Sequence, residues 1–515
     1  MRALAPEFRA YQWAAPSDEV ARLAGIDESQ VLRFDQNTPL LPIASTRPGT
    51  IAGSLARVSG YPAGGYRTLR RAIADYAGVE PENIVLGAGA DDLILLCARA
   101  WAGPGDEIAI PEAPTYPLYR IAAQLASATP EPGSRSEPGS RVLTFACRPN
   151  NPTGELLPLP DARPLVVDEA YFEYSGVTAV DLIDEGVVVL RTFSKLFGLA
   201  GARIGYAMAS VDTAAELNAR QAPAPVSTLS ASLAIAALAE RPDPQPTIEE
   251  RERLASALRA LGLAPLKSHT NFLYVPVEDG LALGDALLRQ GIVVRAYPDA
   301  IRMSVLDAPD DDFLVEALAR ILDKPAPVAA AGARRARTLR ATAETRLATR
   351  LALDGASRVR VSTGAGLYDH FLEQLAFHAG FDLVLEGAGD LETGDHHTAE
   401  DAALALGEAL DRALGDRRGI ARYGDAVVPM DDALARAAVD LGGRANSELK
   451  LELDPGMATH MLASFAQAAR ASINVEANGR DAHHVAEAAF KAVGRALRAA
   501  TRVEGAGLPS TKGLL

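Results

Sequence analysis

The chain has 515 residues, a formal net charge of −15 at pH 7, 48% hydrophobic residues and 23% charged residues. This composition predicts a soluble globular protein of two to four domains, and the acidity argues against a nucleic-acid partner. The sequence has only two cysteines, Cys97 and Cys147, which excludes a disulfide framework. It has no apolar run that could span a bilayer and no targeting signal at its start. These features favour a cytoplasmic location without membrane partners.

Residues 30–325 alternate short β-branched runs with Ala/Leu-rich stretches, which predicts an α/β fold with a largely parallel sheet. The expected strands are residues 83–86, 107–110, 142–145, 165–167 and 187–190. An Ala/Pro/Gly-rich stretch then predicts a linker at 328–337, between a first domain at 1–327 and a second at 338–515. The Pro/Gly/Ser-rich residues 128–140 are expected to form a surface loop without a chemical role.

Polar residues follow several of these expected strands, at the edge where open α/β sheets bind their ligands. The glycine-rich turn 87–91 opens a helix, whose free N–H groups and dipole can hold a phosphate. The segment 148–154 is by itself only a good turn. A buried strand ends in Asp168, and a small-residue loop after the next strand carries Lys195. Taken singly, these are equally a turn, a strand-end acid and a surface lysine.

Together they supply what a pyridoxal phosphate enzyme needs: a Schiff-base lysine, an acid for the pyridine nitrogen and donors for the phosphate. In this order, residues 30–322 resemble the fold-type I aminotransferases, and within them the histidinol-phosphate aminotransferases. The resemblance implies a mostly parallel sheet with helices on both faces and a small C-terminal subdomain. It implies Lys195 as the Schiff-base lysine and Asp168 as the partner of the pyridine nitrogen.

Further roles follow from the same resemblance. Implied cofactor contacts are Ala90, Asp91, Tyr116, Asn151, Tyr171 (also a catalytic candidate), Ser194 and Arg203, with Tyr61 reaching the cofactor of a neighbouring subunit in a dimer. Arg302 is implied to receive the anionic group of the substrate, with Arg295 as its helper. The family's Gly-Asn-Gly-Ser-Asp-Glu reads Gly-Ala-Gly-Ala-Asp-Asp here, so one hydroxyl is lost. The backbone donors remain, and the cofactor is still expected to bind.

The second domain contains seven of the chain's eight histidines. Four of them form two copies of one pattern, His396-His397-Thr-Ala-Glu400 and His483-His484-Val-Ala-Glu487. On a helix the glutamate shares a face with its histidines, whereas adjacent histidines diverge by about 100°. Adjacent histidines are therefore expected to serve two different metal ions. A lone pair would more often be a surface or core feature; the repeat, with its carboxylates, favours a site for Mn, Fe or Zn.

The flanking segments extend this pattern. Residues 338–355 look like an edge β-ribbon, and residues 367–383 place His370 near the start of a helix. Almost all of residues 335–515 resembles the imidazoleglycerol-phosphate dehydratases. The resemblance implies an internally duplicated two-layer α/β domain, each half a sheet backed by helices. It also implies large symmetric assemblies whose metal sites are completed across subunit contacts.

The same resemblance assigns roles by position. The implied metal ligands are His370, His396, His397, Glu400, His483, His484 and Glu487, with Glu344 as the acid/base residue. The implied phosphate-binding residues are Arg422, Arg444, Lys491, Ser510 and Lys512, for which a solvated basic face is the simpler alternative. His378 and His460 are interpreted as supporting or structural residues rather than ligands.

One departure from the family pattern concerns the second histidine pair. The family has a ligand histidine nine residues before that pair, where this chain has Asn474. By pseudo-symmetry with His370, one of the two metal sites is predicted to lack an imidazole and to bind its ion more weakly. Asp432 for Glu and Asp481 for Asn are milder changes.

The leading hypothesis is a bifunctional enzyme of histidine biosynthesis. With Mn²⁺ or a similar ion, the second domain would dehydrate imidazoleglycerol phosphate to imidazoleacetol phosphate. The first would transaminate that product with glutamate to L-histidinol phosphate. Two alternatives stay open: a pyridoxal phosphate-dependent decarboxylase of a phosphorylated amino acid at the N-terminus, or a catalytically degenerate metal-binding assembly module at the C-terminus. A homo-oligomer is expected, dimeric through the first domain and larger through the second.

Overall fold

The computed structural model describes residues 8–26, 28, 31–38, 53–55, 58–133, 141–325, 334–355, 357–454 and 456–509. Ser510 and Lys512, both predicted to bind phosphate, lie outside the described residues. The chain divides into two compact units, Met1–Ala24 with Leu32–Pro327 and Gly25–Val31 with Val328–Leu515. The first strand of the second unit begins at Arg335, inside the predicted linker, so its last residues are part of a sheet.

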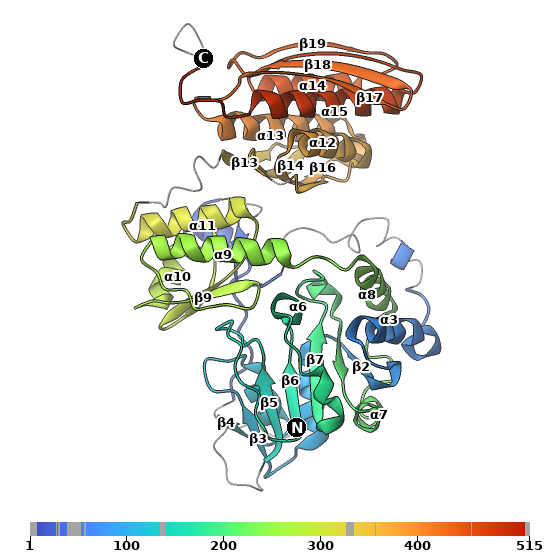
Figure 1. Ribbon diagram of the computed structural model, residues 1–515, viewed down its shortest axis with the longest axis vertical. Coiled ribbons are helices and arrows are strands. Elements are labelled where there is room, and N and C mark those ends of the chain that lie inside the picture. The colour runs from blue at the N-terminus through green and yellow to red at the C-terminus, as the bar shows by residue number, and fades with distance from the viewer. Residues whose placement is uncertain are drawn as a thin grey trace. The chain divides into compact units, whose positions relative to one another are not determined.

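The first unit is built on a seven-stranded sheet of order β2-β8-β7-β6-β5-β3-β4 (Figure 1). Only β8 runs antiparallel to its neighbours, as the predicted, largely parallel sheet requires. The five expected strands are all present: β3 has the expected bounds, β2 is shifted by one residue, and β5, β6 and β7 are longer than expected by one to three residues. The strands are β2 (Ile84–Gly87), β3 (Glu107–Ile110), β4 (Thr129–Pro132), β5 (Arg141–Cys147), β6 (Leu165–Asp168), β7 (Val187–Thr192) and β8 (Gly205–Met208).

Helices cover both faces of this sheet. Because successive strand residues point to opposite faces, Val187 and Val189 join one hydrophobic cluster while Val188 and Leu190 join another. The first cluster includes α3 (Arg67–Ala77) and α8 (Thr228–Glu240); the second includes α4 (Ala90–Trp101), α5 (Leu118–Leu125) and α7 (Val211–Ala219). Every residue of β6 and β7 is therefore buried, which explains the continuous apolar runs with which both strands begin.

A smaller subdomain follows, as predicted, with its own hydrophobic cluster. Its antiparallel sheet has the order β11-β12-β9, and a short parallel pair joins β1 to β10. Asp279 caps the N-terminus of α10 by accepting a hydrogen bond from the Ala282 N–H. The elements are β1 (Leu32–Arg33), β9 (Phe272–Pro276), β10 (Ile292–Val293), β11 (Arg295–Tyr297), β12 (Ala300–Ser304), α9 (Gln245–Ala260), α10 (Gly280–Leu288) and α11 (Ala308–Ile321).

The second unit contains two four-stranded sheets of identical design. Their orders are β13-β14-β16-β15 and β17-β18-β20-β19, each with two antiparallel pairings and one parallel pairing. In the predicted ribbon, β13 is the edge strand and β14 lies one strand further in. The strands are β13 (Arg335–Ala341), β14 (Thr345–Ala352), β15 (Val359–Ser362), β16 (Asp382–Gly389), β17 (Tyr423–Met430), β18 (Ala433–Asp440), β19 (Asn446–Leu451) and β20 (Ser472–Asn478).

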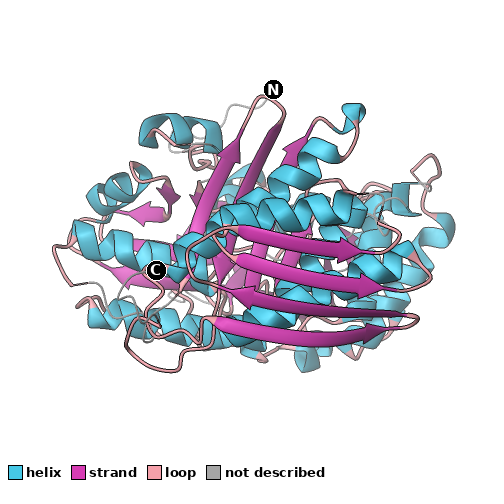
Figure 2. Cartoon of the chain, turned by 90° about the horizontal axis from the view of Figure 1, so that it is seen from above, coloured by secondary structure: helices cyan, strands magenta, loops and turns pink. Residues whose placement is uncertain are grey.

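Four helices lie between these two sheets and share one hydrophobic core (Figures 1 and 2). They are α12 (Gly366–Ala379), α13 (His396–Leu414), α14 (Met457–Ala468) and α15 (Ala482–Ala500). Helices from different halves pack together, α12 against α15 and α13 against α14. Glycine permits both close approaches: an added Cβ would lie 2.4 Å from the Leu375 carbonyl oxygen at Gly494 and 2.6 Å from the Phe465 carbonyl oxygen at Gly407.

Candidate active sites

In the first unit, the candidate residues meet at the carboxyl edge of three adjacent strands. Asn151 follows β5, Asp168 ends β6 and Lys195 follows β7. Since these strands are parallel neighbours, their carboxyl ends bring the amide, the carboxylate and the amine to the same edge of the sheet.

Lys195 has the properties of a reactive amine. Its Nζ lies 5.4 Å from the centre of the Tyr171 ring, and within the described part of the chain it has no hydrogen-bond or ion-pair partner. Burial, with the positive charge of Arg302 as the next cause, lowers the pKa of Lys195 to about 8. A larger neutral fraction at physiological pH makes this amine a better nucleophile than an exposed lysine.

Asp168 is a buried carboxylate with hydrogen bonds to both oxygens. The Tyr119 hydroxyl donates to Oδ2 at 2.7 Å, and the Ala170 N–H donates to Oδ1 at 3.0 Å. Burial raises the pKa of Asp168 to about 6, while these two hydrogen bonds oppose that rise. The carboxylate is thus held in one orientation and is available to a cationic partner.

Three further candidates surround this edge. Arg302 on β12 is 7% exposed and donates to Asn151 Oδ1 at 2.8 Å and to the Asp35 carbonyl oxygen at 2.6 Å. The Tyr171 hydroxyl accepts a hydrogen bond from Asn37 Nδ2 at 3.0 Å. The predicted Asn151, Tyr171 and Arg302 therefore lie within one hydrogen-bonded region. Sequence reasoning missed Asn37, which belongs to no motif and reaches the site from the start of the chain.

The start of α4 provides the expected place for a phosphate. The helix begins at Ala90 after Gly89, whose φ of 91° lies in a region that favours glycine. Arg203 pairs with Asp91 at 3.2 Å, and the Tyr116 hydroxyl donates to the same carboxylate at 3.0 Å. Ser194 accepts a hydrogen bond from the Thr192 hydroxyl at 2.9 Å.

An aromatic residue near the N-terminus also reaches this site. The Tyr11 ring lies 6.5 Å from the Tyr116 ring and 5.9 Å from the Arg295 guanidinium, centre to centre. Arg295 in turn donates to the Gln12 carbonyl oxygen at 3.1 Å. Nothing in the sequence around Tyr11 indicated this position. Tyr61 is 93% exposed, which leaves it available to a neighbouring subunit.

In the second unit, the histidines gather at the beginnings of the helices in two matching clusters. One cluster combines His370 of α12 with His483 and Glu487 of α15: the His370 and His483 Nε2 atoms lie 3.6 and 3.4 Å from the Glu487 carboxylate. The other combines His460 of α14 with His396 and Glu400 of α13, where the His396 and His460 Nε2 atoms lie 3.6 and 3.3 Å from Glu400 Oε2.

The second cluster contains His460, which the sequence interpretation treated as a supporting residue. His460 stands as far before the start of β20 as His370 stands before the start of β16, so it is the counterpart of His370 in the second half. Its imidazole lies 3.3 Å from Glu400 Oε2 and joins the cluster that Glu400 anchors, so His460 is a candidate ligand that the sequence interpretation did not include. Comparison of the two halves around their equivalent strands would have found it.

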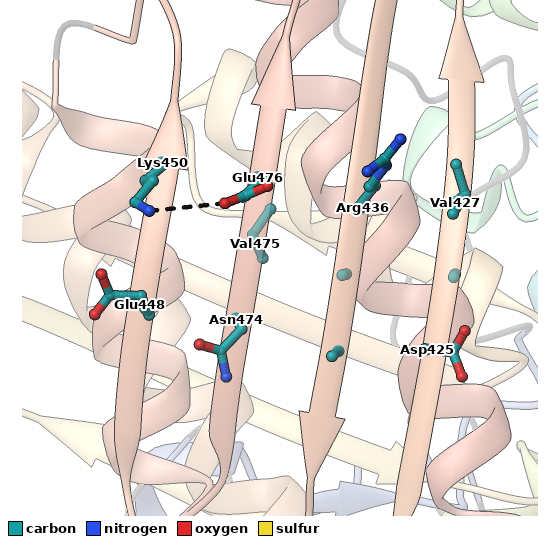
Figure 3. Close-up of a pocket in the computed structure, with 11 residues that line it drawn as sticks. Asp425, Val427, Arg436, Glu448, Lys450, Asn474, Val475 and Glu476 are labelled. Atoms are coloured by element: carbon teal, nitrogen blue, oxygen red, sulfur yellow. Dashed lines mark ion pairs between the residues drawn. The ribbon is translucent and has the colours of Figure 1, made fainter.

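Asn474, by contrast, is not part of either cluster. It lies in the middle of β20, exposed on the face of the sheet opposite the helices. Figure 3 shows it there beside Glu448 and Glu476, along an open groove of about 280 Å³. A side chain on this face points away from His483 and Glu487, which lie on the helix side. The predicted loss of one imidazole at this position is therefore wrong within a single chain.

The second histidine of each pair turns to a different group of acids. His397 Nδ1 lies 3.0 Å from Asp390 and 3.7 Å from Glu344, and its hydrogen bond to Asp390 raises the pKa of His397. His484 Nδ1 lies 2.6 Å from Asp432 Oδ1, which raises the pKa of His484 and lowers that of Asp432 to about 2. Adjacent histidines thus diverge, as the helical geometry predicts.

The candidate phosphate-binding residues do not form one cluster in the described chain. Arg422 precedes β17, pairs with Asp440 at 2.7 Å and donates to the Pro509 carbonyl oxygen. Lys491 pairs with Glu487 at 2.8 Å and contacts Met430, at the other end of β17. Eight strand residues span roughly 25 Å. Arg444 is exposed. Within the described chain, Arg422 and Lys491 therefore do not lie at one point, and the role of these residues in phosphate binding stays a prediction.

The donor sets fit the groups that the sequence implied. Imidazole nitrogens with one carboxylate, all within 4.8 Å of one another, suit divalent transition metals. The unpartnered Lys195, the buried Asp168 and the α4 N-terminus suit a phosphorylated aldehyde with a basic ring nitrogen. None of the helices in the described ranges is long and apolar enough to cross a membrane.

Comparison with known proteins matches the two parts of the chain to two different families. Residues 29–321 match the model of aminotransferase class I and II, and residues 363–497 match that of imidazoleglycerol-phosphate dehydratase. An imidazoleglycerol-phosphate dehydratase of Salinispora tropica is 48% identical over 201 residues, which cover 35% of this chain and 99% of that protein. One of Phytophthora nicotianae is 48% identical over 212 residues, 39% of this chain, but the chain spans only 47% of that relative's length.

Among solved structures, the first unit is similar to a histidinol-phosphate aminotransferase of Sinorhizobium meliloti in complex with pyridoxal-5'-phosphate. The TM-score is 0.54 at 26% identity, covering 61% of this chain and 96% of that one. The fold of the first unit is that of the fold-type I transferases. The chain belongs to the aminotransferase class I and II family over its first part and to the imidazoleglycerol-phosphate dehydratase family over its second.

Proposed function

We propose that this chain catalyses two consecutive steps of histidine biosynthesis. The second unit dehydrates imidazoleglycerol phosphate to imidazoleacetol phosphate, and the first transaminates that product with glutamate to L-histidinol phosphate. The observation that carries the proposal is that one chain holds two clusters of two imidazoles and a carboxylate together with the Lys195–Asp168–Arg302 site. The product proposed for one site is the substrate proposed for the other.

For the dehydration, the two clusters would hold two divalent ions, Mn²⁺ or a similar metal. Such ions supply Lewis-acid stabilisation of charge that develops on the imidazole ring and the departing hydroxyl. Glu344 is exposed in the turn between β13 and β14, 3.7 Å from His397, where its carboxylate can take up and return a proton. This arrangement supports Glu344 as the acid/base residue.

For the transamination, pyridoxal phosphate would supply an electron sink for the bond broken at the amino-acid carbon. Lys195 would bind the cofactor carbonyl and then move protons, and Asp168 would hold a proton on the ring nitrogen. The α4 N-terminus with Ser194 and Arg203 would bind the cofactor phosphate. Arg302 would bind the anionic group of either substrate. Its buried guanidinium donates a hydrogen bond to Asn151, and its charge acts on the hydroxyl of Tyr171, so it lies beside the predicted cofactor contacts.

Parts of both sites would come from other copies of the chain. His397 and His484 face away from the clusters of their own chain, and Arg422 and Lys491 lie at opposite ends of β17. We propose a homo-oligomer in which a neighbouring subunit contributes His397, His484 and Tyr61, together with Arg444, Ser510 and Lys512 around the substrate phosphate. The cytoplasmic location expected from the sequence stays a prediction.

A coupled assay tests the proposal. Purified protein with Mn²⁺ and pyridoxal phosphate is given imidazoleglycerol phosphate and glutamate, and histidinol phosphate and 2-oxoglutarate are quantified. A chelator should stop the first step and spare transamination of added imidazoleacetol phosphate. Release of CO₂ from a phosphorylated amino acid, with no 2-oxoglutarate, would favour the decarboxylase. Metal binding without conversion of imidazoleglycerol phosphate would favour the degenerate assembly module.

A further inference from the structure

Tyr119 makes the one side-chain hydrogen bond to Asp168 that is present in the described chain. The tyrosine is fully buried on α5, three residues after Tyr116, and its hydroxyl oxygen lies 2.7 Å from Asp168 Oδ2. The Ala170 N–H binds the other carboxylate oxygen at 3.0 Å. Because a carboxylate oxygen accepts more than one hydrogen bond, both oxygens keep a free lone pair for a cationic ring nitrogen.

The aromatic surroundings fix the phenol in this position. The Tyr119 ring is stacked on Phe145 at 5.3 Å and 26°, and it meets the Tyr116 ring edge-on at 5.9 Å and 80°. These contacts leave the phenol little freedom to turn away from Asp168. Burial, with the charge of Asp168 as the next cause, raises the pKa of Tyr119 well above its ordinary value, so the phenol stays neutral and donates its proton at every physiological pH.

The other groups around Asp168 do not replace this hydrogen bond. Those that act on it electrostatically, or that feel its charge, are Asp91 on α4, Cys147 on β5, Lys195 after β7, and the hydroxyls of Tyr116 and Tyr171. Asp91 disfavours the Asp168 charge and Lys195 favours it, while burial raises the pKa of the Cys147 thiol to about 12. Lys195 bound to the cofactor would carry no free ammonium, and among the described side chains named here Tyr119 would then be the one that favours the carboxylate form.

We propose that Tyr119 is a positioning residue that keeps Asp168 ionised and oriented, so that the proton shared between Asp168 and the cofactor resides on the ring nitrogen. This inference rests on the proposed pyridoxal phosphate function of the first unit. Without the phenol, the buried carboxylate becomes the more basic partner. The shared proton then moves from the ring nitrogen to Asp168, and the ring becomes a weaker electron sink.

The experiment compares wild-type holoenzyme with Tyr119→Phe, each loaded with ¹⁵N-labelled pyridoxal phosphate. The ring-nitrogen NMR resonance should move from the protonated toward the neutral position in the variant, and the cofactor dissociation constant should rise about tenfold, the effect of one hydrogen bond to a charged group. Tyr206→Phe, a buried tyrosine on β8 outside this contact, is the matched control and should change neither quantity.

If Tyr119→Phe does not yield folded protein, site-specific replacement of Tyr119 by 3-fluorotyrosine keeps the ring and makes the phenol a stronger donor. The ring-nitrogen resonance should then stay at or move further toward the protonated position, with cofactor bound at least as tightly. An unchanged resonance in Tyr119→Phe, or a shift toward the neutral position in the fluorotyrosine protein, would overturn the inference. Failure of the wild-type protein to bind pyridoxal phosphate would instead overturn the proposed function.

Discussion

The candidate metal cluster anchored by Glu400 allows the sharpest test of the structure, because it contains His460, which the sequence interpretation did not count as a ligand. His460→Gln removes one of the three donors in this cluster and leaves the His370–His483–Glu487 cluster intact. Changing a residue that only orients a metal ligand typically costs 10- to 100-fold in affinity. Loss of a direct ligand should cost at least about 100-fold, or roughly 2.7 kcal/mol of binding free energy.

The assay is a titration of metal-free full-length protein with Mn²⁺, followed by electron paramagnetic resonance and by metal analysis of the same samples. Wild-type protein should bind two ions per chain, one in each cluster. His460→Gln should retain the ion of the other cluster, with its affinity unchanged. Asn474→His is the matched control: it adds an imidazole to the exposed face of β20 and should leave both affinities as they were. Two undisturbed ions in His460→Gln, or tighter binding in Asn474→His, would refute this reasoning.

Three other expectations concern the remaining residues. Lys195→Ala should abolish the visible absorbance of bound pyridoxal phosphate and leave dehydration intact; loss of both activities would contradict independent sites. Because the pKa of Lys195 is lowered to about 8, the rate of cofactor capture by the apoenzyme should rise with pH and level off above pH 8, whereas an ordinary lysine would keep gaining until about pH 10; stopped-flow absorbance measures this rate. Gly494→Ala should destabilise the second unit by about 1–3 kcal/mol in urea unfolding, since the new methyl group meets the Leu375 carbonyl oxygen. Gly366→Ala, at a helix start with open space, should not.

Most of the fold and many of the candidate site residues could be predicted from the sequence, because they depend on local patterns. Continuous apolar runs such as β7 predict buried parallel strands, and the spacing of His483 and Glu487 predicts a shared helix face. What the sequence did not reveal depends on tertiary contacts. Asn37 reaches the site from an element distant in sequence, and no local motif marks it. Tyr119 stands only three residues after Tyr116, but its role depends on a contact with Asp168 on another element.

The case of Asn474 and His460 has a more specific cause. Counting residues back from His483 leads to a strand, and in a strand the face of a side chain depends on whether the count is odd or even. Asn474 falls on the outer face, while Ile473 and Val475 fall on the inner face. His460 lies on a different helix, and only its position relative to β20, compared with that of His370 relative to β16, identifies it as an equivalent residue.

The packing of α12 on α15 and of α13 on α14 has a consequence for the origin of the second unit. Each cluster takes one histidine from a helix of one half and its histidine–glutamate pair from a helix of the other. A single half, expressed alone, therefore owns every type of ligand but no complete cluster. Such a half could form a complete cluster only by pairing with a second copy of itself, with the close helix packing that Gly407 or Gly494 permits. A gene for half of the second unit would thus encode a protein that binds metal only as a dimer. Joining two copies of that gene would convert the dimer into one chain without moving a ligand.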